Sequence, residues 1–306
     1  MFNVLFHADW STSSNKRWAV CAVRQGSGWY VMEAFQVTSS AEFLNRLFST
    51  DDPVLAGFDF PIGVPAGYGA RTGAGDFLTA LELFGHGRWF DFYRIAETAS
   101  EVSIERPFYP RVSSANAKQA HLLNAHGVSS SDALRRQCER ATDLRHAACP
   151  LFWTLGGNQV GKAAIAGWQE IIAPARARGA RLWPFDGALQ ELSREAVVLA
   201  ETYPAEAYGH IDVKFDRSRE SKRRQEDRAS KATAISKWAE RNHVEFSAEM
   251  LRSIQGGFSR HATGEDRFDA ALGLFGMIEV VEGRRAEGGS TPDARSWEGW
   301  ILGQAA

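Results

Sequence analysis

The stretch VLAGFDF, residues 54–60, is an apolar run that closes on a carboxylate, Asp59. A run of this length, starting after the helix-breaking Asp51-Asp52-Pro53, predicts a strand buried within a sheet. Two other segments share its form: NVLFHAD at 3–9 ends in Asp9, and VVLAETYP at 197–204 closes on Glu201. Such strands predict an α/β protein whose acidic side chains gather at the carboxyl ends of the strands.

The first sixty residues predict the order strand, strand, strand, helix, strand. The segments at 17–24 and 28–35 flank Gly26-Ser27-Gly28, which is a hairpin signal, and Ser39 and Ser40 can cap a helix that follows. An α/β pattern returns near the C-terminus, with helices expected at 187–194, 230–242, 246–254 and 265–283. EGWILG at 298–303 predicts a short strand or a packing tail.

The segment between these two parts differs from them in composition and in the regularity of its pattern. It opens with the glycine-rich loop PIGVPAGYGARTGAG and continues with mixed helical and irregular stretches rich in His, Arg and aromatic residues. We therefore expect residues 1–60 and 186–306 to form the core, and 61–185 to form a long, mainly helical insertion after the fourth strand. This insertion is expected to lie over one end of the sheet as a lid.

Composition limits the classes of function. The 306 residues carry 35 Lys and Arg against 37 Asp and Glu, so any contact with nucleic acid must come from a local patch. The three cysteines lack zinc-site spacing and predict no disulfide framework, which favours the cytoplasm. We expect neither a signal peptide nor a membrane span, and the sequence does not indicate an oligomeric state.

Further acids lie on the predicted C-terminal helix. Asp266 and Asp269 are three residues apart and therefore share one helix face. An acid at a strand end is commonly only a turn or helix cap, but here Asp9, Asp59 and Glu201 are expected to meet this helical pair. Clustered carboxylates repel one another unless a cation neutralises them, and oxygen-only ligands favour Mg²⁺ or Mn²⁺ over zinc.

Several strings carry a resemblance that extends over nearly the whole chain: GFDFPIGVP at 57–65, ETYPAEAYG at 201–209, DRFDAALGL at 266–274 and EGWILG at 298–303. With the order of the elements, they resemble the ribonuclease H-like superfamily of nucleases and resolvases, and within it the predicted nuclease family called domain of unknown function 429. The resemblance implies a mixed five-stranded sheet flanked by helices, with the first and fourth strands adjacent.

The resemblance also implies roles for the acids in a two-metal nuclease. Asp9 would bridge both metals, Asp59 would hold one and Asp269 the other, while Asp266 would be a helper or an alternate ligand. Glu201 belongs to the narrower family and completes the predicted catalytic set. Two Mg²⁺ or Mn²⁺ ions would activate water and stabilise the leaving 3′ oxygen of a phosphodiester in DNA or RNA.

A basic segment at 214–231 offers a surface for phosphates. It holds eight basic residues against four acidic ones, and Lys222, Arg223 and Arg224 form its centre. The alternative is a solvated helix of mixed charge. The insertion adds further arginines, and its Phe108, Tyr109 and Trp153 are candidates either to stack on unpaired bases or to form the core of the lid.

TLGGNQVGKA at 154–163 places Gly156, Gly161 and Lys162 on the spacing of a P-loop. Ala163 follows where a P-loop needs a Ser or Thr hydroxyl, so the sequence argues against nucleotide binding there. We predict instead that Asn158, Gln159 and Lys162 stand at the start of a helix and face the scissile phosphate.

Two other functions remain open at this point. One is a phosphotransferase or nucleotidase of the actin-like or sugar-kinase type, although Trp10-Ser11 follows the first acid where those proteins have a glycine-rich turn. The other is a non-catalytic module on the same fold that binds nucleic acid or a protein.

Overall fold

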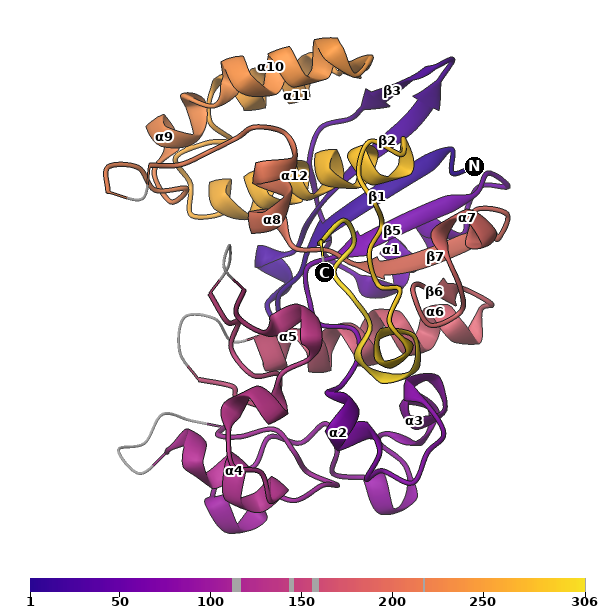
Figure 1. Ribbon diagram of the computed structural model, residues 1–306. Coiled ribbons are helices and arrows are strands. Elements are labelled where there is room, and N and C mark those ends of the chain that lie inside the picture. The colour runs from indigo at the N-terminus through magenta and orange to yellow at the C-terminus, as the bar shows by residue number, and fades with distance from the viewer. Residues whose placement is uncertain (112–116, 143–145, 156–159, 217, 306) are drawn as a thin grey trace.

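The computed structural model describes residues 1–111, 117–142, 146–155, 160–216 and 218–305. Within these residues it contains an eight-stranded mixed sheet in the order β6-β7-β5-β1-β2-β3-β8, with β4 paired to β2 (Figure 1). The strands are β1 (Val4–Asp9), β2 (Trp18–Gln25), β3 (Gly28–Val31), β4 (Phe35–Gln36), β5 (Val54–Phe58), β6 (Arg181–Leu182), β7 (Val197–Glu201) and β8 (Val244–Phe246). The α/β class is confirmed, whereas the expected five strands are supplemented by the short β4, β6 and β8.

The register of the central strands fixes where the acids emerge. β1 pairs in parallel with β5, with Ala8 opposite Phe58, so Asp9 and Asp59 leave the sheet side by side at the same edge. β5 pairs in parallel with β7, which places Glu201 opposite Phe58. The predicted β2–β3 hairpin is present, and Gly26 takes the left-handed backbone conformation that its turn requires, with φ of 58°.

Helices cover both faces of the sheet (Figure 1). On one side the chain forms α8 (Pro204–His210), α9 (Gln225–Ala229), α10 (Ala232–Arg241), α11 (Ala248–Gln255) and α12 (Gly264–Val281). On the other side, and beyond the strand ends, lie α1 (Ser40–Leu47), α2 (Ala66–Gly69), α3 (Phe77–Leu83), α4 (Gln119–His126), α5 (Val160–Gly167) and α6 (Ala173–Ala177). The helix expected at 187–194 is reduced to α7 (Leu189–Leu192).

The long helix α12 is buried along most of its length against β1, β2 and α8. Gly273 lets it approach the sheet, because a Cβ at this position would lie 2.2 Å from the His7 ring. His7 donates from Nδ1 to the Ala270 carbonyl at 2.9 Å, and its Nε2 accepts from Thr202 Oγ1 at 2.8 Å. Burial lowers the pKa of His7 to about 3, so the neutral ring ties α12 to β1 and to the end of β7.

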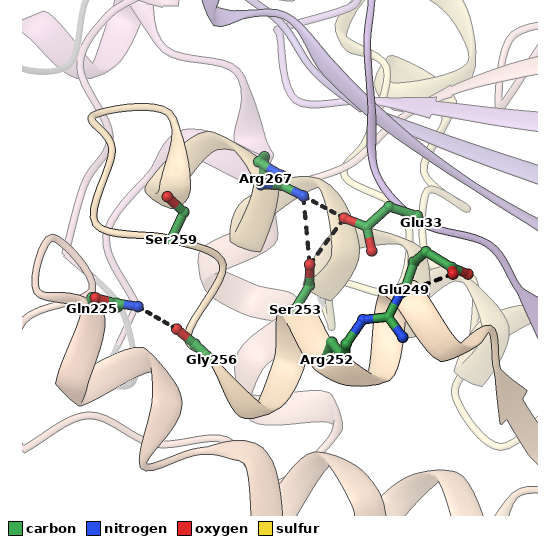
Figure 2. A pocket seen from close by; sticks show the side chains of 8 residues that line it. All are labelled: Glu33, Gln225, Glu249, Arg252, Ser253, Gly256, Ser259 and Arg267. Carbon is green, nitrogen blue, oxygen red and sulfur yellow. Dashed lines mark hydrogen bonds and ion pairs between the residues drawn. The ribbon is translucent and has the colours of Figure 1, made fainter.

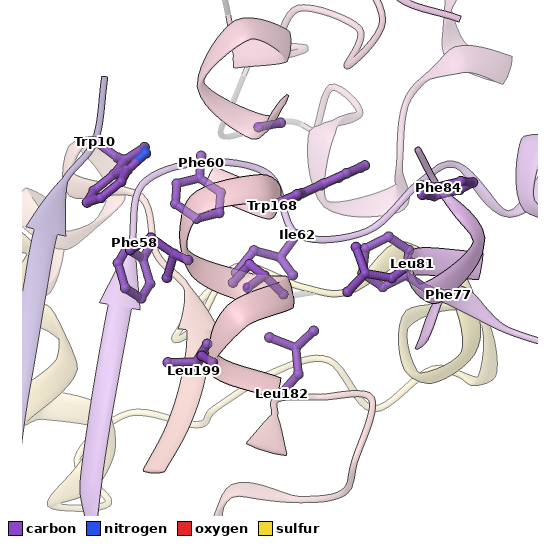
Figure 3. Close-up of a cluster of buried hydrophobic side chains, with 14 of the residues drawn as sticks. Trp10, Phe58, Phe60, Ile62, Phe77, Leu81, Phe84, Trp168, Leu182 and Leu199 are labelled. Carbon is purple, nitrogen blue, oxygen red and sulfur yellow. The ribbon is translucent and has the colours of Figure 1, made fainter. Parts of the chain in front are cut away.

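The opposite face of the sheet shares its hydrophobic core with the insertion. Trp168 lies between Phe60 and Phe84 (Figure 3), and its indole N–H donates to the Pro61 carbonyl at 2.7 Å. The π-helical turn Trp168–Ile172 joins α5 to α6. Phe108 and Tyr109 are buried in the same core, which favours their interpretation as packing residues.

The insertion is therefore continuous with the sheet. Strand β6 falls inside the predicted 61–185 segment, yet it pairs in parallel with β7. The C-terminal tail at 298–304 joins the two parts from the other side: Ile301 forms an isolated parallel bridge with Glu201. Glu298 accepts from the backbone N–H groups of Ala66 at 3.1 Å and Gln137 at 2.7 Å.

The helices within the described ranges are all too short or too polar to cross a bilayer.

Candidate functional site

Asp9 and Asp59 form the centre of the acidic cluster. Asp9 ends β1, Asp59 directly follows β5, and the two carboxyl groups hydrogen-bond to each other. Asp59 Oδ1 also accepts the backbone N–H of Trp10 at 2.6 Å, and the Trp10 ring packs against Phe58. Burial raises the pKa of both carboxyls, and the charge of Asp59 raises that of Asp9 further. Bringing two carboxyl groups together in a buried position is costly unless a cation neutralises them.

Asp269 approaches this pair from the second turn of α12. Its Oδ1 accepts the phenolic O–H of Tyr208, and its Oδ2 lies 2.6 Å from Lys222 Nζ. Burial raises the pKa of Asp269 while Lys222 opposes the rise, and the charge of Asp269 in turn raises the pKa values of Asp9 and Asp59. Three of the predicted acids are thus brought together.

Asp266 stands one turn earlier on α12, where it is partly buried. Burial raises its pKa to about 6, the charge of Lys16 lowers it, and Asp269 raises it again. Its charge reaches Asp9 as well, so the fourth acid belongs to the same cluster.

Glu201, predicted to complete the catalytic set, lies apart from this cluster in an ion pair with Arg136. Its two carboxylate oxygens each accept from Arg136 at 2.6 Å, and Oε2 also accepts the Ile62 N–H at 2.6 Å. Both side chains are almost fully buried. The carboxylate at the end of β7 therefore binds the insertion to the sheet. Arg136, one of the arginines of the insertion, is engaged in that buried pair and is not available to a phosphate.

The basic segment does not form the solvated helix that was its alternative interpretation. Residues 214–216 and 218–224 are irregular or form turns, and the only helix they lead to is the short α9. Lys222 points into the acids, where its Nζ also lies 3.2 Å from Glu265 Oε1. Burial lowers the pKa of Lys222, but the charges of Asp269 and Glu265 outweigh that effect, so the amine stays charged. Arg223 is exposed and Arg224 pairs with Asp227 at 2.6 Å.

The P-loop frame has a structural explanation in the part that is described. Gly161 lies in the first turn of α5, and a Cβ there would come within 2.4 Å of the Leu151 carbonyl oxygen, so glycine is needed for packing. Lys162 is partly buried on the same helix. Asn158 and Gln159, predicted to contact the phosphate, lie outside the described residues.

A separate pocket of about 450 Å³ lies beside α11 and α12 (Figure 2). Arg267 is next to Asp266 in sequence but extends into this pocket, where it pairs with Glu33, and Arg252 pairs with Glu249 at 2.9 Å. Because these charges compensate one another, the pocket adds no cationic surface to the acidic cluster.

The residues that hold the acids in place were not predicted from the sequence. Tyr208 on α8, the Trp10 backbone and Glu265 each contact a member of the cluster or its lysine. Tyr208 and Thr202 do fall in the quoted string ETYPAEAYG, but their roles depend on which strand and helix they face. Spacing alone did not indicate those partners.

The donor chemistry fits a hard divalent cation at Asp9 and Asp59, which offer carboxylate oxygens. Among the described residues, however, no three His, Cys, Asp or Glu side chains are arranged together as a metal-binding group. At Asp269, Tyr208 and Lys222 engage both carboxylate oxygens. A divalent cation thus fits well at Asp9 and Asp59 on the strands and less well at Asp269 on α12.

Comparisons with protein-family models, curated proteins and solved structures gave no significant match. The site is therefore defined by its own side chains at the ends of β1, β5, α8 and α12.

Proposed function

We propose that the protein is a divalent-metal-dependent phosphodiester hydrolase that acts on nucleic acid and is built on a ribonuclease H-like sheet. The observation that carries the proposal is the hydrogen-bonded pair of Asp9 and Asp59 on adjacent parallel strands, approached by Asp269 from α12. The adjacency of β1 and β5 that the ribonuclease H-like resemblance implies supports the fold assignment.

Asp9 and Asp59 would hold Mg²⁺ or Mn²⁺, and the bound ion would supply Lewis-acid chemistry at the phosphate and its attacking water. The Trp10 N–H fixes the orientation of Asp59, and Tyr208 fixes that of Asp269. Asp266, with a pKa raised by burial to about 6, is suited to accept a proton near neutral pH.

An exposed aromatic side chain supports nucleic acid as the substrate class. Tyr203 is 48% exposed at the start of α8, and the charges of Lys222, Asp269 and Asp59 all act on its phenol. An exposed ring beside a phosphate-cleaving site can stack on an unpaired base. We therefore propose that the substrate includes a single-stranded segment.

The test is cleavage of end-labelled single-stranded and duplex DNA and RNA in the presence of Mn²⁺ or Mg²⁺. Asp9→Asn and Asp59→Asn should each reduce the cleavage rate by roughly a hundredfold or more. The matched control is Asp51→Asn, an exposed acid in the loop before β5, which should cleave as the wild type does. Undiminished cleavage by Asp9→Asn would contradict the proposal.

A further inference from the structure

Lys222 is a basic side chain that reaches into the acidic cluster. Its Nζ lies 2.6 Å from Asp269 Oδ2 and 3.2 Å from Glu265 Oε1, so one ammonium group bridges two carboxylates of α12. Asp9 and Asp59, by contrast, have no ion pair with a Lys, Arg or His side chain within the described ranges. The strand side of the cluster thus lacks a bound cation, whereas the helix side has one.

The backbone that carries Lys222 is held firmly. Arg228, which is almost fully buried, donates to the Lys222 carbonyl at 2.5 Å, to the Ser259 carbonyl at 2.7 Å and to the Gly257 carbonyl at 3.0 Å. Asp227 accepts the Ser221 N–H at 2.7 Å. These bonds fix the residue before Lys222 and its own carbonyl, and the ion pairs with Asp269 and Glu265 then hold the ammonium group.

Asp269 itself has little capacity left for a metal ion. The Tyr208 hydroxyl engages Oδ1 and Lys222 engages Oδ2. A divalent ion on Asp269 would have to displace the Lys222 ammonium from a buried carboxylate, which costs the energy of a charge-assisted hydrogen bond. The same ion on Asp9 and Asp59 would displace no side-chain cation of the described residues.

We propose that Lys222 is the resident cation on the α12 side of the site, so that the chain binds one divalent cation, on Asp9 and Asp59, instead of two. This inference rests on the proposed function and makes it more specific. The ammonium supplies a fixed positive charge beside Asp269, where the two-metal arrangement would require a second ion. Lys222 is then a positioning residue for a phosphate-bearing substrate, and not one of a row of exposed surface cations.

The experiment measures how many Mn²⁺ ions bind per chain, by calorimetry and by electron paramagnetic resonance of free Mn²⁺. We expect the wild type to bind about one ion and Lys222→Met to bind about two, because Asp269 and Glu265 lose their cation. Lys222→Arg keeps the charge and should bind about one ion. Arg223→Met is the matched control, since it removes an exposed neighbouring cation, and it should also bind about one ion.

Asp269→Asn gives an answer even if Lys222→Met fails to fold. On this proposal the variant still binds about one Mn²⁺, with an affinity within several-fold of the wild type, because the ion lies on the strand pair. Two ions in the wild type would overturn the proposal if one of them is lost in Asp269→Asn. They would overturn it equally if Lys222→Met gains no further ion.

Cleavage assays on the same preparations separate this inference from the proposed function. One ion in the wild type and two in Lys222→Met, without cleavage of any nucleic acid, would support the role of Lys222 and overturn the nuclease. Two ions in the wild type, with cleavage that depends on Asp9, would support the nuclease and overturn the role of Lys222.

Discussion

Arg136 donates to both carboxylate oxygens of Glu201 at 2.6 Å, across 65 positions of the sequence. The guanidinium also donates to Glu139 at 2.9 Å and to the Glu298 carbonyl at 3.0 Å. These contacts satisfy the buried charges internally, and they connect the insertion, β7 and the C-terminal tail at one point. A buried charge so fully partnered is tolerated only while its partners stay in place.

Removing Arg136 should therefore cost far more stability than removing an exposed arginine. Arg136→Met leaves Glu201 buried without its cation and should lower the free energy of unfolding by about 3–5 kcal/mol, as measured in urea. Arg111→Met removes an exposed partner of Glu97 and should change the free energy of unfolding by less than about 1 kcal/mol. Equal losses in the two variants would show that the buried pair has no special structural role.

Asp9→Asn should stabilise the metal-free protein while it destroys the site. The pKa of Asp9 is raised by burial and by Asp59, so at neutral pH the folded state bears the cost of keeping a proton or a second charge there. An amide removes that cost, and the unfolding free energy should rise by about 1 kcal/mol at pH 7 without metal. Added Mn²⁺ should raise the melting temperature of the wild type but not that of the variant.

Gly273→Ala tests the close approach of α12 to His7. Alanine normally favours a helix over glycine by about 1 kcal/mol, but here its methyl group would lie 2.2 Å from the His7 ring. We expect a net loss of about 1–3 kcal/mol in a urea unfolding experiment. Gly209→Ala in α8 is the control, because open space surrounds its Cβ position, and it should be neutral or stabilising. A stabilising Gly273→Ala would contradict the packing described.

His126 should make the protein less stable in mild acid. It is buried between Tyr68 and Phe152, and burial, with help from Arg71, lowers its pKa to about 4. The unfolded chain, with a pKa of about 6.5, binds more protons between these values, so stability is complete above pH 6.5 and falls as pH drops toward 4. The loss should be on the order of 3 kcal/mol at most. Burial also keeps His7 neutral, so stability should still fall in His126→Phe when unfolding is followed between pH 7 and 4.5, but by less than in the wild type.

The sequence predicted that Asp9 and Asp59 would lie side by side because parallel strands deliver their ends to one edge. Asp9 and Asp59 come from adjacent strands, and Asp269 comes from the helix that covers them, so local patterns and one topological rule were sufficient. The α/β class followed from the same periodicities. The short strands β4, β6 and β8 span two or three residues each and leave no periodic signal.

The partners of the acids were harder to predict because they are remote in sequence. Glu201 has the same strand-end pattern as Asp59, and the difference between them lies in Arg136, whose position depends on how the insertion folds. Lys222 looked like part of a basic surface because composition does not show which lysine the backbone anchors. In both cases long-range contacts, and not residue type, decide the role.

The tail at 298–304 has a consequence for how the chain reaches its structure. Glu298 contacts Gln137 and Ala66 across 161 and 232 positions, and these contacts complete the junction between insertion and sheet. Contacts so distant along the chain slow folding, since loop-closure entropy is lost before they form. During synthesis that junction has to wait until residues 298–304 leave the ribosome, so the sheet and the insertion, which are made earlier, must persist with the junction open.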